Sequence, residues 1–315
     1  MSKHSAIAVA NNIKTVLLLG GMTGLFVAVG AIWGTQGMIM ALILGGLMNV
    51  VSWFFSDKIA IAAMRGRQVG PEHPAYRIVE DLAHRAGLPQ PRVYVCPHQA
   101  PNAFATGRSP RKAAVCFTEG ALALLDEDEL RGVAAHELSH VKNRDTLTSC
   151  VAATIAGVLA FLAQWGFWMF RGSRRDVNPL VMIAVVIIAA VAAAMIKAMI
   201  SRSREYVADA DGAAMAGSPN GLISALQKLE AYAGRIPLEQ PNPAQNNLFI
   251  IEPLAGSAGR TLVNLFASHP PTEKRIAALR SVRRAIRERW AHEGGGHRAA
   301  LCLRVVHGAM AGWVR

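Results

Sequence analysis

The stretch that decides the fold is His136-Glu137-Leu138-Ser139-His140. On an α-helix, side chains four residues apart lie on one face, so both imidazoles can bind one metal ion. Glu137 lies one residue round the helix from His136, where it can reach a metal-activated water without occupying the coordination sphere. A zinc ion lowers the pKa of such a water, and a nearby carboxylate can take its proton. The string therefore predicts zinc-dependent hydrolysis of a peptide bond, with Glu137 as the general base.

The helix that carries this string has well-marked ends in the sequence. Asp126 can cap its N-terminus, and Glu129, three residues on, completes a capping box. Acidic residues in the first turn also favour the positive end of the helix dipole. We therefore expect a helix from about Glu127 to Asn143. The alternative to a metal site is that the two histidines lie on the surface of an ordinary helix.

A catalytic zinc site needs a third protein ligand and one open position. No third histidine follows His140 at the spacing of the metzincins, and no other histidine has a comparable setting. A carboxylate on another helix is the better candidate. Glu205 and Asp209 lie four residues apart on one helical face, so Glu205 can bind zinc while Asp209 orients a ligand from behind it. Taken alone, these two acidic residues could equally lie on the exposed face of an ordinary surface helix.

The composition indicates a membrane protein. Hydrophobic residues make up 52% of the 315 residues and charged residues 17%, and the hydrophobic residues collect in four apolar blocks. The net charge of +12 is explained by anionic lipid at a membrane face. No nucleic-acid motif accompanies that charge, so we expect no nucleic-acid partner. Four cysteines without a CxxC pair favour a reducing compartment, with Cys96 and Cys116 buried as small hydrophobic residues.

The first two apolar blocks, Thr15–Trp33 and Gly37–Phe55, are 19 residues each without a charge. As helices they would each span about 28 Å, close to the hydrocarbon thickness of a bilayer. No cleavage site separates them, so we expect an uncleaved transmembrane hairpin over residues 1–56. Two later blocks, Leu147–Phe170 and Leu180–Ile196, predict a second apolar hairpin over residues 147–200, inserted between the zinc ligands.

The protease domain is expected in residues 57–146 and 201–290, followed by a tail of unknown role at 291–315. Its short β-rich runs predict a small sheet or hairpin. The fold class is thus a mainly α integral membrane protein with a small β element and a zincin-like catalytic domain of the gluzincin type. The predicted strands are Arg92–Cys96, Asn102–Thr106 and Ala113–Thr118, and the further helices are Pro74–Ala86, Ser201–Ala216, Pro219–Ala233 and Thr272–Trp290.

Four strings, taken together, resemble one family. They are HELSHVKNRD from His136, SRSREYVAD ending at Asp209, NAFATG at Asn102–Gly107 and SHPPTEKRI at Ser268–Ile276. Over about residues 1–285 the chain resembles the HtpX-type heat-shock membrane proteases, relatives of the eukaryotic CAAX prenyl endopeptidase. The resemblance implies a multi-pass zinc endopeptidase of the bacterial inner membrane with a cytoplasmic active site. Its substrates would be misfolded membrane proteins or other unfolded polypeptides.

The same resemblance places His136, His140 and Glu205 on the family's zinc ligands, with one Zn²⁺ per chain, and Glu137 on its catalytic base. Three other functions stay open: a dedicated processing protease, a non-catalytic scaffold with structural zinc, and a zinc transporter. An intact Glu137 argues against the scaffold, since structural zinc needs no base. The apolar blocks contain no histidine or carboxylate, which argues against the transporter.

Two further residues take roles from the resemblance alone. Asn102 falls in the strand thought to lie along the substrate backbone. His269 falls on a histidine that stabilises the oxyanion of the transition state. An entry position of the helix after Pro270-Pro271 explains His269 equally well.

The distribution of basic residues predicts the orientation. Nine lysines and arginines would flank the membrane on the active-site side, against three in the turn at residues 171–175, which favours a cytoplasmic site. The three arginines leave open an alternative in which the second hairpin re-enters without crossing. The nine are Lys3, Lys14, Lys58, Arg65, Arg67, Lys142, Arg144, Arg202 and Arg204, and the three are Arg171, Arg174 and Arg175.

Overall fold

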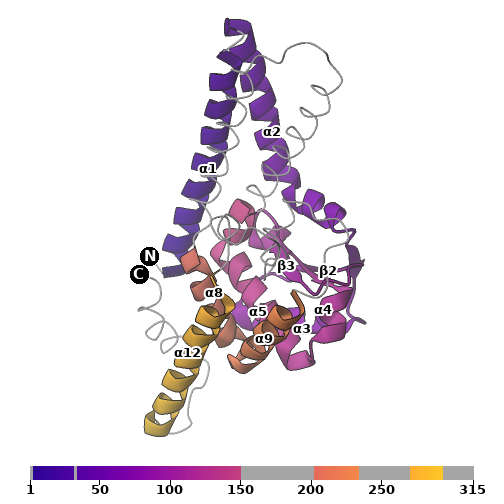
Figure 1. The fold of residues 1–315 in the computed structure, drawn as a ribbon, viewed down its shortest axis with the longest axis vertical. Helices are drawn as coiled ribbons and strands as arrows, with labels where there is room; N and C mark the ends of the chain where they lie inside the picture. The colour runs from indigo at the N-terminus through magenta and orange to yellow at the C-terminus, as the bar shows by residue number, and fades with distance from the viewer. Residues whose placement is uncertain (1–2, 32–33, 150–201, 234–269, 294–315) are drawn as a thin grey trace.

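The computed structural model of the chain describes residues 3–31, 34–149, 202–233 and 270–293 (Figure 1). These residues form a long helical hairpin and a body in which helices pack on a small sheet. The mainly helical architecture with a small β element is therefore confirmed. Most of the predicted second hairpin (150–200) lies outside the described residues. The same holds for most of the predicted tail (294–315).

The hairpin consists of α1 (Lys3–Gly30) and α2 (Gly34–Ala63), which lie side by side and project from the body (Figure 1). Asn49 of α2 donates a hydrogen bond to Thr23 Oγ1 of α1 at 2.7 Å. Among the described residues, α2 alone is long and apolar enough to cross a membrane on length and composition, with a mean hydropathy of 2.0. Every exposed large hydrophobic side chain of the described residues, Tyr232 excepted, lies on α1 or α2. A hairpin that faces lipid requires such a surface.

The body contains a four-stranded sheet in the order β1-β2-β4-β3. The central pair, β2 and β4, is parallel, and the two outer strands run antiparallel to their neighbours. The strand β3 therefore forms one edge of this sheet. The bounds are β1 Arg67–Val69, β2 Arg92–Cys96, β3 Ala103–Thr106 and β4 Ala114–Thr118, with α3 Pro74–Ala86, the 3-10 turn η2 Pro110–Lys112 and α4 Glu119–Leu124 between or after them.

Both faces of the sheet are buried. One face packs with Val93, Val115 and Phe117 against the helices of the body. The other packs with side chains such as Tyr94 and Phe104 against Ile61 and Met64, at the end of α2. The long helix α2 is thus part of the same core as the sheet, which fixes where the hairpin leaves the body.

The helix α5 (Glu127–Asn143) carries the HExxH string and begins with the predicted capping box. Asp126 Oδ1 accepts from the Glu129 amide, and Glu129 Oε2 accepts from the Asp126 amide, both at 2.9 Å. Glu129, buried, also accepts from Lys228 Nζ at 2.6 Å, on helix α9 (Asn220–Ala233). The N-terminal turn of α5 is therefore fixed both locally and by a distant helix.

The helix α8 (Arg202–Ala216) lies against α5 because a glycine stands at their closest approach. A Cβ atom on Gly212 would lie 2.9 Å from the backbone nitrogen of His136, closer than real Cβ contacts allow. The last described helix, α12 (Thr272–Glu293), packs on α8 and α9. The helices α8 and α9, both from a distant part of the sequence, thus pack directly on α5.

The predicted elements match those observed closely. The predicted helices at Pro74–Ala86 and Glu127–Asn143 have the observed bounds, and the strands agree within one residue. Cys96 and Cys116 are buried, as expected. The sequence did not predict β1 or α4, and α1 begins well before the apolar run at Thr15.

Candidate metal centre

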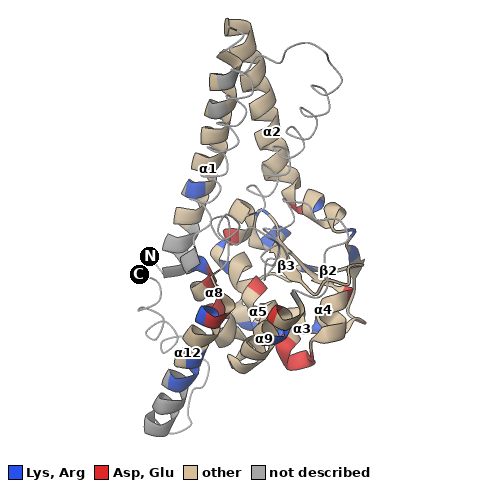
Figure 2. Ribbon diagram, in the orientation of Figure 1, with Lys and Arg blue, Asp and Glu red and all other residues tan. Residues whose placement is uncertain are grey.

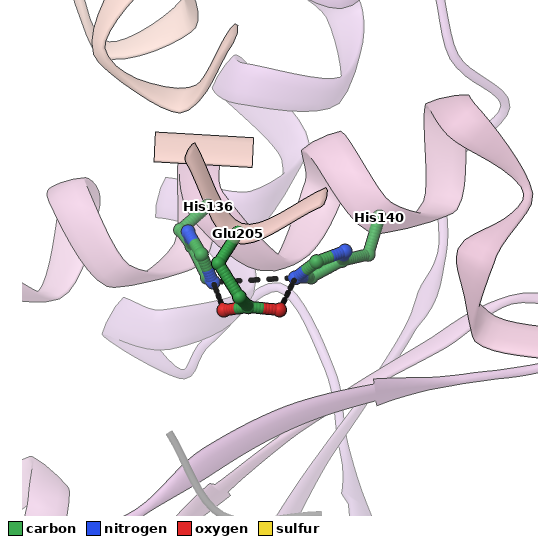
Figure 3. A group of neighbouring side chains, drawn as sticks. All are labelled: His136, His140 and Glu205. Atoms are coloured by element: carbon green, nitrogen blue, oxygen red, sulfur yellow. Dashed lines mark hydrogen bonds and ion pairs between the residues drawn. The ribbon is translucent and has the colours of Figure 1, made fainter. Parts of the chain in front are cut away.

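Three side chains from two helices meet at the centre of the body (Figure 3). His136 and His140 lie one turn apart on α5, with their Nε2 atoms 3.2 Å from each other. Glu205 reaches them from α8, with Oε2 3.6 Å from His136 Nε2 and Oε1 3.6 Å from His140 Nε2. A tetrahedral zinc ion holds its ligand atoms about 3.4 Å apart, so this spacing already matches the ion.

Each imidazole is oriented by a carboxylate on its other nitrogen. His136 Nδ1 lies 2.9 Å from Asp209 Oδ1, and His140 Nδ1 lies 3.1 Å from Asp145 Oδ2. A carboxylate that accepts from Nδ1 favours the tautomer whose Nε2 carries the free lone pair. Both Nε2 atoms are thus prepared to bind a metal, and the donor set of two histidines and one glutamate is one that zinc uses in peptidases.

The surroundings also favour positive charge at the centre. Burial lowers the pKa of His136, but the hydrogen bonds to Asp209 and Glu205 outweigh it and raise that pKa to about 9. The pKa of His140 is likewise raised, because Asp145 and Glu205 outweigh its burial. The same carboxylates would stabilise a cation held by the two imidazoles in their neutral form.

The carboxylate that orients His140 depends on an unusual helix end. Arg144 takes the left-handed conformation, with φ 58°, and ends α5. Asp145 follows directly and turns back to His140. Its other oxygen, Oδ1, accepts from Asn11 Nδ2 of α1 and lies 3.6 Å from Arg204 Nη1. Asp145, which orients His140, is thus held by α1 of the hairpin as well as by α8 of the body.

A buried arginine binds Asp209, the carboxylate that orients His136. Arg275 of α12 is 1% exposed and donates to Asp209 through Nε at 2.9 Å and Nη2 at 2.6 Å. Burial raises the pKa of the Asp209 carboxyl, but the charge of Arg275 and its hydrogen bond outweigh that and lower the pKa. Nη1 of Arg275 also lies 3.9 Å from Glu205 Oε2. Asp209 is therefore kept ionised by a fixed cation.

The HExxH glutamate faces the sheet edge. Glu137 Oε2 accepts from the backbone amide of Ala105, on β3, at 2.8 Å. Glu137 is 5% exposed, and in the sequence it lies between the two ligands His136 and His140. This hydrogen bond places a carboxylate between the metal ligands and the edge strand.

The structure brings most of the predicted site residues together. Glu205 and Asp209 are 6% and 0% exposed, so the alternative of a surface face is wrong. Asn102 is buried immediately before β3, where its carbonyl accepts from the Thr118 amide at 2.9 Å. His269 lies outside the described residues.

Sequence reasoning missed three residues around this centre: Asn11, Asp145 and Arg275. A signal existed for Arg275, which lies four residues before Leu279 and seven before Val282, on the apolar stripe of its helix. An arginine on a buried stripe requires a carboxylate partner. The contact between Asn11 and Asp145 has no local signal, because it spans 134 positions, although Asp145 is the last residue of the string HELSHVKNRD.

Comparisons with known proteins now identify the family. The model of Peptidase family M48 matches residues 72–283, a range that includes both histidines, Glu205 and Arg275. The chain belongs to peptidase family M48. With the zinc ligands of that family in place, it is a zinc metalloendopeptidase, and the predicted zincin-like domain and Zn²⁺ cofactor are confirmed.

The chain is also similar to individual proteins over most of its length. It is 49% identical over 281 residues to a protease HtpX homolog of Desulforapulum autotrophicum, covering 86% of this chain and 89% of that protein. The protease HtpX homologs of Nostoc punctiforme and Pyrococcus furiosus are 48% and 46% identical, covering 85% and 86% of this chain and 95% of each relative. The resemblance drawn from the four strings is therefore confirmed, and this M48 peptidase is an HtpX-type membrane protease.

One solved structure is also similar. The crystal structure of S. mikatae Ste24p has a TM-score of 0.48 and 17% sequence identity. The alignment covers 89% of this chain but 66% of that one.

Proposed function

We propose that this M48 peptidase removes misfolded or unassembled membrane proteins from the bacterial inner membrane, with its active site on the cytoplasmic side. The observation that carries the proposal is the position of the metal ligands, between an edge strand and a hairpin with an exposed apolar surface. A site at this position can accept an extended segment that leaves the bilayer. The name of its relatives, protease HtpX homolog, agrees with such a role.

The edge strand β3 offers a surface for an extended substrate. Asn102 accepts from the amide of Thr118, so the residues that alternate with it point their backbone groups away from β4. These are Ala103 and Ala105, and the Ala105 amide indeed points to Glu137. Because Glu137 already occupies the Ala105 amide, a peptide added at this edge would pair with the other outward-facing backbone groups of β3 and would need little sequence preference. In this proposal Asn102 fixes the start of the substrate-binding strand.

Glu137 is proposed to move the proton. Zinc, when held by its three ligands, supplies a Lewis acid that makes water acidic and polarises the peptide carbonyl. Glu137 would take a proton from the attacking water as its oxygen adds to the peptide carbonyl carbon, and would return it to the amine as the C–N bond breaks. The Ala105 amide, 2.8 Å from Oε2, holds the carboxylate at the sheet edge where the scissile bond would lie.

Two carboxylates and one histidine complete the proposed machinery. Asp209 and Asp145 keep His136 and His140 in the tautomer that binds metal. His269 is proposed to donate a hydrogen bond to the oxyanion of the transition state. The alternative for His269, a helix-entry role, predicts that its substitution changes stability and leaves the ratio of turnover to zinc content intact.

The orientation in the membrane rests on charge. Basic residues gather where the hairpin joins the body, whereas the distal part of the hairpin has no charged residue among those described (Figure 2). Such a distribution favours a cytoplasmic body. A cysteine at Glu230, exposed on α9, should react with an impermeant reagent only after the membrane is permeabilised. Reaction in intact cells would reverse the orientation.

The substrate class can be tested with one membrane protein in two states. The purified enzyme should cleave a destabilised variant of a membrane protein much faster than the same protein in its native state. Glu137→Gln enzyme serves as the control for contaminating proteases. Cleavage at one sequence regardless of folding state would support the remaining alternative, a dedicated processing protease.

A further inference from the structure

A second potential binding site lies apart from the metal centre, where α2 meets the sheet. It is a cavity of about 440 Å³, within the size range of small-ligand sites. None of the three metal ligands lines it. Half of its ten lining residues are basic: Lys58, Arg92, Arg108, Arg111 and Lys112.

The charge of this cavity favours an anion. Asp57 is the one acidic residue among those that line it, and its Oδ2 already accepts from Arg92 Nη2 at 2.8 Å. The other four basic side chains have no carboxylate within the lining. Arginine binds phosphate oxygens through two parallel hydrogen bonds, so a phosphate group suits this set of donors.

The position of the cavity favours a lipid as the source of that phosphate. Phe54 and Phe55, which line it, are the last residues of the uncharged run of α2 and are 50% and 45% exposed. The Arg108 guanidinium lies 4.7 Å from the centre of the Phe54 ring, and Lys58 Nζ lies 5.4 Å from that of Phe55. Basic side chains at the end of an apolar helix are typical of the headgroup region of an anionic bilayer.

We propose that this cavity binds the phosphate headgroup of an anionic phospholipid, with the acyl chains lying along the exposed apolar surface of α2. The proposal rests on α2 spanning the bilayer, as the proposed function does, but not on the zinc chemistry. Arg108, Arg111 and Lys112 belong to the connection between β3 and β4, and this connection begins directly after β3. A bound lipid therefore also holds the end of the edge strand near Glu137.

The test compares lipids on the full-length chain. The protein is placed in nanodiscs of equal parts phosphatidylglycerol and phosphatidylcholine, and the lipids retained on release are counted by native mass spectrometry. The wild type should retain phosphatidylglycerol in preference. Arg108→Gln/Arg111→Gln should weaken that retention at least about tenfold, because two cations near the headgroup are lost.

A matched control separates the cavity from general charge. Arg280→Gln/Arg284→Gln removes the same charge from exposed positions of α12 that do not line the cavity, and should leave retention unchanged. An equal loss in this control, or no loss in the cavity variant, would overturn the proposal. Binding of inorganic phosphate as tightly as phosphatidylglycerol would also overturn it, since the lipid would then add nothing to the binding of the free anion.

Zinc content distinguishes failure of this site from failure of the enzyme. All these variants should hold one zinc per chain, because none of the substituted residues lies at the metal centre. If Arg108→Gln/Arg111→Gln loses its zinc through misfolding, Lys58→Gln/Lys112→Gln provides the same test from other positions of the cavity. Unchanged retention in that second pair would then contradict the proposal.

Discussion

Asn11 donates its side-chain amide to Asp145 Oδ1 at 2.5 Å, although the two residues lie 134 positions apart. The same amide donates to the carbonyl of Asn143 at 2.9 Å. Since Asp145 orients His140, the first helix of the hairpin is linked to a metal ligand by two consecutive contacts. One turn further along α1, Thr15 Oγ1 lies 2.7 Å from Thr148 Oγ1. The hairpin therefore does more than anchor the body in a membrane.

Asn11→Ala should weaken zinc binding several-fold while leaving the three ligands intact. The substitution removes a donor that holds Asp145, so His140 loses part of its orientation. The effect should be smaller than the roughly 10- to 100-fold loss expected when a ligand's own partner is removed, as in Asp145→Asn. Competition with a chelator measures the affinity. Asn12→Ala, on the same helix, is the control, and an equal loss there would show a general effect on α1.

Asp209→Asn should lower zinc affinity or activity about 10- to 100-fold. The amide is similar in size to the carboxylate but stabilises the metal-binding tautomer of His136 less well. Zinc titration and peptide hydrolysis on the same sample measure the two effects separately. Unchanged affinity and turnover would mean that the 2.9 Å contact with His136 has no role in the site.

Arg275→Met should destabilise the fold by about 3–5 kcal/mol, because it breaks a buried ion pair and leaves His136 as the partner of the Asp209 carboxylate. Chemical unfolding of the zinc-free protein in detergent measures this change. Arg280→Met, at an exposed position of the same helix, should cost far less. Adding Asp209→Asn to Arg275→Met should recover part of the loss, whereas simple additivity would show that the two residues do not act as a pair.

Gly212→Ala should lower both stability and zinc affinity. The added methyl would meet the backbone of His136 at 2.9 Å, so α8 must move away from α5 and carry Glu205 with it. Overpacking of this kind costs about 1–3 kcal/mol. In Gly46→Ala the new Cβ meets nothing within 4 Å, so that variant should be neutral or slightly stabilised through its helix propensity. If both variants behave alike, close packing at Gly212 is not what positions Glu205.

The parts of the site that follow local rules could be predicted from the sequence. The capping box at Asp126 and Glu129 and the four-residue spacing of His136 and His140 are properties of one helix. Glu205 was found because a third ligand was needed and a carboxylate stood in a helical string that resembles the family. Strands β2 and β4 were found because they are β-rich and bounded by turns.

The residues that could not be predicted depend on contacts between distant elements. Asp145 looks like any acidic residue after a helix until Arg144 turns the chain back to His140. Asn11 lies shortly before the uncharged run and gains its role only where α1 meets the end of α5. The strand β1 has three residues, too few to show a period, and exists because β2 offers it a partner.

The most direct measurement of the central claim is peptide hydrolysis by Glu137→Gln enzyme whose zinc content has been determined on the same sample. The substitution keeps His136, His140 and Glu205 and removes only the proposed base. We expect about one zinc per chain, as in the wild type, and a fall in turnover of at least about 100-fold, which is the usual contribution of a general base. Near-normal hydrolysis by this zinc-loaded variant would contradict the account.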